Sequence, residues 1–305
     1  MRRIFATGLL AVVGVLMLES TASAQEIQLT GPLAGAPAVR ELRWHRNGRL
    51  EIAPTVSFTL LDEYKRTIFA GARLQYHVFD WLGVGVWGAY GVVHMNTALT
   101  DEIDKVDKYR WDSDRDLEPP ETRARTQIDR NASLLSVGQD FPNQLGKIQW
   151  IAAPQITAVP FRGKLALFQK IFVDTDIYVF GGPAFIGLEE RADYSATDLD
   201  PSNPKSVVDA NGRKVKPYPM ATRMAIAPTF GLGMTFYTGS WTGLSLEYRA
   251  IPFAWNASGF DSRGGPPDES GPDFKVDGKD RAFKFNQMIS LSFSFFLPTG
   301  IKSSP

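Results

Sequence analysis

The sequence predicts an all-β fold, a single closed antiparallel transmembrane β-barrel of eight strands. Three observations predict it: apolar and polar residues alternate along many segments, these segments are long, and short and long connections alternate between them. Strands of globular proteins have about five or six residues. A tilted strand needs about ten to cross a bilayer, and the alternating segments reach that length.

The alternation is clearest in residues 224–236, where one face is apolar and the other is small or polar. The apolar face carries Met224, Ile226, Pro228, Phe230, Leu232, Met234 and Phe236. The same period of two recurs in residues 52–60, 68–78, 244–248 and 289–295. Side chains alternate between the two faces of a strand, so each segment would expose one apolar face to lipid and direct one polar face inward.

The connections then predict the topology. We expect strands at 50–61, 67–79, 82–95, 147–159, 175–189, 222–237, 241–254 and 283–297. The links Asp80-Trp81 and Gly239-Ser240 are short, whereas the links 95–146, 190–221 and 255–282 are long and charged. Eight strands place all the long links at one end, as in membrane barrels with short periplasmic turns and long extracellular loops.

Residues 163–172 do not fit this scheme directly. We interpret them as a short helix or an ordered periplasmic turn, because Leu165, Phe168 and Phe172 would share one helical face. A ninth strand is the alternative, and it would move the later long loops to the other side of the membrane.

Aromatic residues gather near the predicted strand ends. We expect the following side chains to form two interfacial girdles, as amphipathic rings do in membrane barrels: Trp81, Tyr90, Trp150, Tyr237, Trp241 and Trp255.

The first 24 residues have the pattern of a secretory signal peptide. Arg2 and Arg3 precede an apolar stretch, and Ala22-Ser23-Ala24 provides a small-residue cleavage site. We predict Sec export with cleavage after Ala24; a retained membrane anchor is the alternative. Residues 25–49 would form a periplasmic leader, whose regularly spaced arginines would meet anionic lipid or solvent, and residues 50–305 would form the barrel.

Composition excludes several kinds of chemistry. The 305 residues contain no cysteine, which removes thiol nucleophiles, thiolate metal sites and disulfides. The 33 basic residues equal the 33 acidic ones, and this balance argues against nucleic-acid binding.

We find no convincing catalytic, cofactor or metal site in the sequence. The chain has three histidines, and neither His77 nor His94 is followed two positions later by serine, the local pattern of lipid A deacylases. The acidic runs 112–116 and 268–280 have ligand types that suit calcium but lack the EF-hand spacing. Solvated loop acidity is the preferred interpretation of both runs.

Charged and polar residues also recur on the predicted inner face. These are Arg73, Gln75, His77, Glu247 and Arg249. Buried charges are costly unless they are paired. We therefore predict an ion-pair and hydrogen-bond network that fills the lumen, because eight strands leave room only for side chains.

Several short sequence segments resemble those of a known family. Gly48-Arg49-Leu50-Glu51-Ile52-Ala53-Pro54, then Gly71-Ala72-Arg73-Leu74-Gln75-Tyr76-His77 and Asp80-Trp81-Leu82, resemble the outer membrane beta-barrel domain proteins of myxobacteria and their relatives. Residues 153–154, 163–168 and 176–182 fit the same family. The resemblance implies a small barrel of the OmpA or OmpX kind in the outer membrane, and it implies no known activity.

Three functional hypotheses follow. The leading one is a non-enzymatic outer-membrane protein with an envelope-structural or surface-interaction role through its long loops. A lipid-modifying barrel enzyme and a narrow channel for small solutes are the alternatives, and a soluble periplasmic sandwich is a more remote one. The expected partners are outer-membrane lipid, lipopolysaccharide and, during biogenesis, the barrel-assembly machinery.

Overall fold

The computed structural model describes residues 46–105, 141–167, 171–193, 219–265, 271–272 and 276–298. The signal peptide, most of the leader, the middle of each long link and the acidic run 112–116 lie outside these ranges. No helix in the described ranges is both long enough and apolar enough to cross a membrane.

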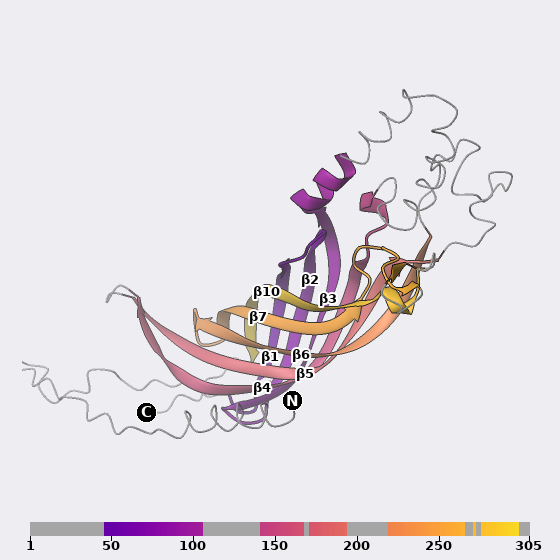
Figure 1. The fold of residues 1–305 in the computed structure, drawn as a ribbon. Coiled ribbons are helices and arrows are strands. Elements are labelled where there is room, and N and C mark those ends of the chain that lie inside the picture. The colour runs from indigo at the N-terminus through magenta and orange to yellow at the C-terminus, as the bar shows by residue number, and fades with distance from the viewer. Residues whose placement is uncertain are drawn as a thin grey trace, which may run out of the picture. The chain divides into compact units, whose positions relative to one another are not determined.

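Eight long strands close into one antiparallel barrel, as the sequence predicts (Figure 1). They are β1 (Leu50–Leu60), β2 (Lys65–His77), β3 (Leu82–Asn96), β4 (Lys147–Leu167), β5 (Ile171–Arg191), β6 (Met220–Tyr237), β7 (Thr242–Trp255) and β10 (Ala282–Leu297). Each strand pairs with its sequence neighbours among these eight, and β1 closes the barrel against β10 with Thr55 opposite Ser292. The two-residue strands β8 (Gly264–Gly265) and β9 (Gly271–Pro272) pair separately within the last long link.

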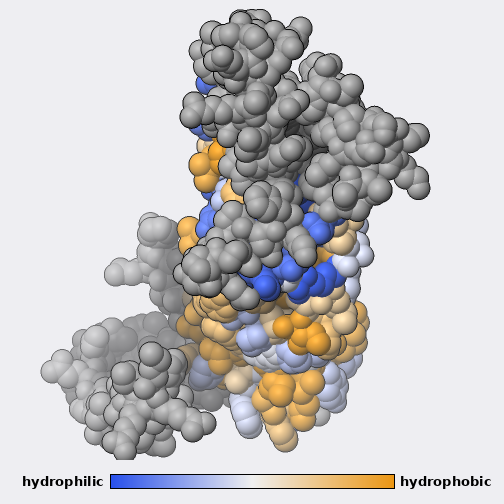
Figure 2. Space-filling model, turned by 45° about the vertical axis from the view of Figure 1, so that its right-hand side comes forward, coloured by the Kyte–Doolittle hydropathy of each residue, from blue (hydrophilic) through white to orange (hydrophobic). Residues whose placement is uncertain are grey.

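The alternating pattern decides which face of each strand points outward. On β6, Ile226, Phe230 and Leu232 are exposed, while Ala227 and Thr229 between them are buried. Strands β1, β2, β7 and β10 repeat this pattern at the positions expected from the sequence. Much of the visible barrel wall is consequently apolar (Figure 2).

The prediction of a helix or turn at 163–172 is wrong. Residues 163–167 continue β4 and pair with residues 171–175 of β5, so the two strands form one long hairpin. The hairpin projects beyond its neighbours (Figure 1), because β3 pairs with β4 only as far as Ala158 and β6 pairs with β5 only from Thr175. The segment lengthens two strands and adds no ninth strand, so the long links stay at one end.

We call the end of the barrel that carries residues 78–81 and 238–241 the short-turn end, and the opposite end the loop end. Along β7 the inward residues change from Ser245 and Glu247 near the short-turn end, through Arg249, to Ile251 and then the aromatic Phe253 and Trp255. The lumen therefore has a polar part toward the short-turn end and an apolar part toward the loop end. The apolar part includes Phe69, Trp87, Ile151, Ile186, Ile251, Phe253 and Met288.

Residues 46–49 fold against the short-turn end instead of remaining solvated or bound to lipid. The backbone N–H groups of Arg46 and Asn47 donate to Asp80 Oδ1 at 2.7 and 3.0 Å. Gly48 adopts a φ of 75°, a conformation that favours glycine. The buried Arg49 guanidinium donates to Ser240 O, at 3.2 Å from Nη1 and 3.1 Å from Nη2.

Arg46 is itself buried, and it forms an ion pair with Asp176 beside the Tyr237 ring. Burial acts to lower its pKa, yet Tyr237, Asp176 and Glu51 together hold the pKa above the ordinary arginine value. The guanidinium is therefore a permanent charge of the short-turn end.

The loop end is covered by two segments that lie against each other. Arg191 Nη1 donates to Gln144 Oε1 and to Gly259 O, both at 3.0 Å, and so joins residues 141–146 to residues 256–260. Gly259 has a φ of 67°, and a Cβ atom there would lie 2.3 Å from Gln144 O. The close approach of these two segments therefore requires glycine at position 259.

Candidate functional site

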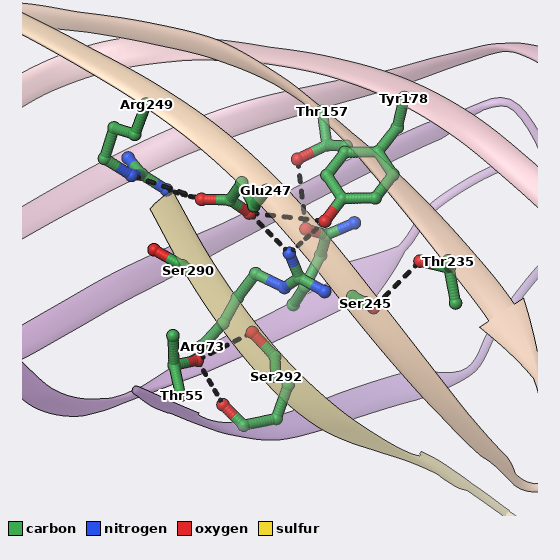
Figure 3. A network of polar contacts seen from close by, with 12 residues as sticks. Thr55, Arg73, Thr157, Tyr178, Thr235, Ser245, Glu247, Arg249, Ser290 and Ser292 are labelled. Carbon is green, nitrogen blue, oxygen red and sulfur yellow. Dashed lines mark hydrogen bonds and ion pairs between the residues drawn. The ribbon is translucent and has the colours of Figure 1, made fainter. Parts of the chain in front are cut away.

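The polar part of the lumen is built around one arginine shared by two carboxylates. Arg73 of β2 donates from Nη2 to Glu51 Oε1 at 2.6 Å and from Nη1 to Glu247 Oε2 at 2.7 Å. Its Nη1 also donates to Tyr178 OH at 2.8 Å. Glu51 and Glu247 come from β1 and β7, so Arg73 joins three strands across the bore. Figure 3 shows Arg73 with Glu247 and Tyr178.

Arg249 forms the next layer toward the loop end. It donates to Glu247 Oε1 at 2.7 Å and to Gln155 Oε1 at 2.8 Å. Its guanidinium carbon lies 4.3 Å from the centroid of the Trp87 ring and 4.2 Å from that of Phe180. Arginine stacks well between aromatic faces, so these two rings hold the charge where the lumen becomes apolar.

His77 and Gln75 extend the polar layer. His77 Nε2 lies 3.1 Å from Glu51 Oε2, and Gln75 Oε1 accepts a hydrogen bond from Thr157 Oγ1 at 3.0 Å. Hydroxyl pairs join the strands at the same depth, among them Thr55–Ser292 and Thr235–Ser245 (Figure 3). We call Glu51, Arg73, His77, Tyr178, Glu247 and Arg249 the lumen cluster.

The lumen cluster is balanced in charge and buried. Its two arginines match its two glutamates in formal charge, and none of the four is more than 2% exposed. Each carboxylate oxygen has at least one donor within 3.2 Å. Such mutual satisfaction is what makes buried charges tolerable.

All five residues expected in the lumen face inward and are buried: Arg73, Gln75, His77, Glu247 and Arg249. Gln75 contacts Thr157, whereas the other four meet in the lumen cluster. The sequence reasoning missed Glu51 as the partner of Arg73, and it missed the inward rings Trp87, Tyr178 and Phe180. The alternation on β1 could have identified Glu51, because Glu51 lies on the same inward face of the strand as Thr55.

The six proposed girdle residues divide into two groups. Trp81, Tyr90 and Trp241 are exposed, and Trp150 is half-buried on the outward face. Tyr237 and Trp255 instead point into the barrel, where Tyr237 OH donates to Asp176 Oδ2 at 2.7 Å and Trp255 Nε1 donates to Asn286 Oδ1 at 3.2 Å. These two assignments are wrong, because both residues have inward parity on β6 and β7.

One histidine lies near a hydroxyl, the arrangement that the lipid-modifying alternative would need. His94 Nδ1 is 3.0 Å from Thr67 Oγ1. In the described ranges no carboxylate is hydrogen-bonded to His94, so this pair lacks the third group that orients the base in a catalytic triad. The described residues also contain no group of three or more acidic or histidine side chains arranged to bind a metal ion.

No protein-family profile and no curated protein sequence matches the chain. Among solved structures, the chain is similar to the N-terminal barrel domain of OprF from Pseudomonas aeruginosa, at 8% identity over 82% of this chain and 98% of that one, with a TM-score of 0.38. OprG from the same organism gives 9% identity over 84% and 99%, with a TM-score of 0.35. Ail from Yersinia pestis gives 11% over 82% and 99%, with a TM-score of 0.30. At these values the matches bear on neither activity nor partners.

The strand count and the two faces of the wall define the class of molecule. Exposed apolar side chains surround the barrel, and a hydrogen-bonded polar network lies within it. A closed sheet satisfies every backbone group of its wall internally, which a protein in lipid requires. The chain thus has the architecture of a bacterial outer-membrane barrel.

Proposed function

We propose that this chain is a non-enzymatic outer-membrane protein with a closed lumen, which acts in envelope structure or in surface interaction through its loop end. The observation that carries the proposal is the lumen cluster, in which Arg73 bridges Glu51 and Glu247 across the bore at 2.6 and 2.7 Å. Because the apolar cluster fills the next part of the lumen, the interior serves to hold the barrel rather than to conduct.

The orientation belongs to the same proposal. The short-turn end would face the periplasm, where the leader emerges after export, and the loop end would face the outside together with lipopolysaccharide. The resemblance of residues 48–54, 71–77 and 80–82 to the myxobacterial barrel proteins supports the outer-membrane location. We further propose the barrel-assembly machinery as the partner during insertion.

Epitope labelling tests the orientation. A tag inserted after Lys105 should be detected on intact Gram-negative cells, whereas a tag between Gly239 and Ser240 should be detected only after the outer membrane is permeabilised. Heat-modifiable gel migration of each tagged protein shows that the barrel has folded. The reverse labelling pattern would contradict the proposal.

The absence of catalysis is tested with lipid substrates. Folded protein incubated with phospholipid vesicles and with lipopolysaccharide should release no fatty acid above a protein-free control. The His94–Thr67 pair provides the comparison variants His94→Ala and Thr67→Ala. Release by the wild type that either variant abolishes would establish an enzyme and overturn this part of the proposal.

A further inference from the structure

A cavity lies where the closing seam of the barrel ends. The β1–β10 pairing stops at Leu60 opposite Gln287, whereas β10 continues to Ala282, paired there with Trp255 of β7. The turn 61–64 joins β1 to β2 at this point. A cavity of about 210 Å³ lies between this turn and the end of β10, and we call it the seam cavity.

The seam cavity joins the apolar wall to the loop end. Leu60 and Phe285 contribute apolar side chains from strand positions that face outward, and Phe285 is 48% exposed. Trp255 lines it from the interior. An occupant could therefore have one part in the lipid phase and another part in the cavity, as an amphiphile does.

The polar lining has one unsatisfied acceptor. Lys284 Nζ is 2.7 Å from Glu63 Oε2, and Lys65 Nζ donates to Pro142 O at 3.2 Å. Asp62 Oδ2, by contrast, is enclosed and has no hydrogen-bond partner among the described residues. Thr59 is hydrogen-bonded to the same carboxylate, which leaves it with fewer donors than its two oxygens can accept. A buried acceptor without a donor is costly, so a ligand that donates to Asp62 would stabilise the site.

The other lining groups restrict the ligand further. The aromatic residues Tyr64, Trp255 and Phe285 surround the cavity beside Asp62, and aromatic faces attract cations. Lys65 and Lys284 contribute ammonium groups that suit a phosphate. Asp62 and Glu63 bring the number of formally charged lining side chains to four, and these four have no net formal charge, which matches a zwitterionic head group.

We propose that the seam cavity binds a membrane lipid whose head group carries a primary ammonium and a phosphate. The ammonium donates to the Asp62 carboxylate, the phosphate meets Lys65 and Lys284, and the acyl chains lie along Leu60 and Phe285. The proposal goes beyond the proposed function and rests on it only in placing the apolar wall in a bilayer.

Protonation of Asp62 should govern this binding. Burial raises the pKa of Asp62 to about 6, against the opposing effects of Thr59 and Arg66. The other titratable side chains that line the cavity are Glu63, Tyr64, Lys65 and Lys284. A protonated Asp62 cannot pair with an ammonium as a carboxylate does, so retention of the lipid should fall as the pH drops below about 6.

The test measures which lipid stays with the folded barrel. Protein in detergent micelles receives equal amounts of phosphatidylethanolamine, phosphatidylcholine and phosphatidylglycerol at pH 8, and native mass spectrometry counts the bound lipids. A charge-assisted hydrogen bond implies that phosphatidylethanolamine is retained at least roughly tenfold better than phosphatidylcholine, whose quaternary ammonium cannot donate. Equal retention of these two lipids, or equal retention of phosphatidylglycerol, would overturn the proposal without any variant.

Variants then localise the effect. Asp62→Asn should lower phosphatidylethanolamine retention to the level of phosphatidylcholine, while Glu102→Gln, an exposed change outside the cavity, should leave retention unchanged. Unaltered selectivity in Asp62→Asn would contradict the assignment. Soluble phosphoethanolamine at the same concentration should not displace the lipid, and displacement would contradict the role of the acyl chains. Heat-modifiable migration in each sample reports separately on the barrel.

Discussion

Arg73 lies between two buried carboxylates. We therefore expect the stability of the barrel to depend on Arg73 more than on any other charged residue of the lumen. Replacing Arg73 with methionine leaves Glu51 and Glu247 without their common partner. We expect this change to lower the free energy of unfolding by about 3–5 kcal/mol, the usual loss when one partner of a buried ion pair is removed. This loss is measured by urea unfolding of the barrel in detergent micelles, with heat-modifiable gel migration as the readout of the folded fraction.

Arg66→Met on the same strand is the matched control, because Arg66 is exposed. Its effect should stay within about 0.5 kcal/mol. The triple change Arg73→Met, Glu51→Gln and Glu247→Gln should recover part of the loss, since it removes the uncompensated charges. Equal stability of Arg73→Met and Arg66→Met would refute the role assigned to the lumen cluster.

Arg249→Leu should be the milder of the two lumen changes. Glu247 keeps Arg73 and Tyr178 as donors, and an apolar side chain fits between Trp87 and Phe180. We expect a loss on the order of 2 kcal/mol in the same unfolding assay. A loss larger than that of Arg73→Met would show that the network is centred on Arg249 instead.

The raised pKa of Asp62 predicts that the free energy of unfolding depends on pH. Its pKa is raised to about 6 in the folded protein, whereas an unfolded aspartate titrates near about 4. The folded chain thus binds more protons than the unfolded chain between these values, so its free energy of unfolding decreases as the pH rises through about 6.

The difference in stability between wild type and Asp62→Asn isolates this effect. In lipid-free detergent, the wild type should lose on the order of 2 kcal/mol relative to the variant between pH 4 and pH 7. Asp101→Asn, an exposed change, should show no such difference. A constant gap between wild type and Asp62→Asn across this range would mean that the burial of Asp62 does not shift its titration.

The face of the strand on which each residue lies is the feature of the site that the sequence predicts best. Because side chains alternate strictly along a strand, Arg73, His77, Glu247 and Arg249 could all be placed inward from their spacing alone. The same rule, applied at positions 237 and 255, would have placed Tyr237 and Trp255 inside as well. Which inward residues touch depends on the register between neighbouring strands. The alternation along a single strand does not reveal that register.

At the scale of the elements, the β4–β5 hairpin is the feature that the sequence did not predict. Residues 163–172 satisfy a helical pattern and a strand pattern equally well, since short apolar runs do not distinguish them. Tertiary pairing decides between the two, because residues 163–167 meet residues 171–175 directly.

The projecting part of this hairpin should be dispensable. Its residues pair with each other and not with β3 or β6, as the registers of β4 and β5 show. Replacing residues 165–173 with a two-residue Asn-Gly turn, which keeps Lys164 opposite Asp174, should change the free energy of unfolding by less than about 1 kcal/mol. Urea unfolding measures it, and failure of the shortened chain to show heat-modifiable migration would mean that the extension is needed for closure.

At the scale of the whole molecule, the closed lumen that we propose and the stability that we predict depend on the same interior side chains. The polar network and the apolar cluster fill successive parts of the lumen, while residues 46–49 and the segments 141–146 and 256–260 lie at its two ends. The eight strands and their faces were predictable from alternation and link length. The division of the lumen into polar and apolar parts was not, because it depends on inward rings such as Trp87 and Phe180.

Single-channel recording in planar lipid bilayers tests the central claim most directly. Folded wild-type protein, with insertion verified by heat-modifiable migration of the reconstituted sample, should give no discrete conductance steps at neutral pH. Reproducible steps in the wild type that scale with salt concentration would show a continuous aqueous path through the lumen and would contradict the account of a filled barrel.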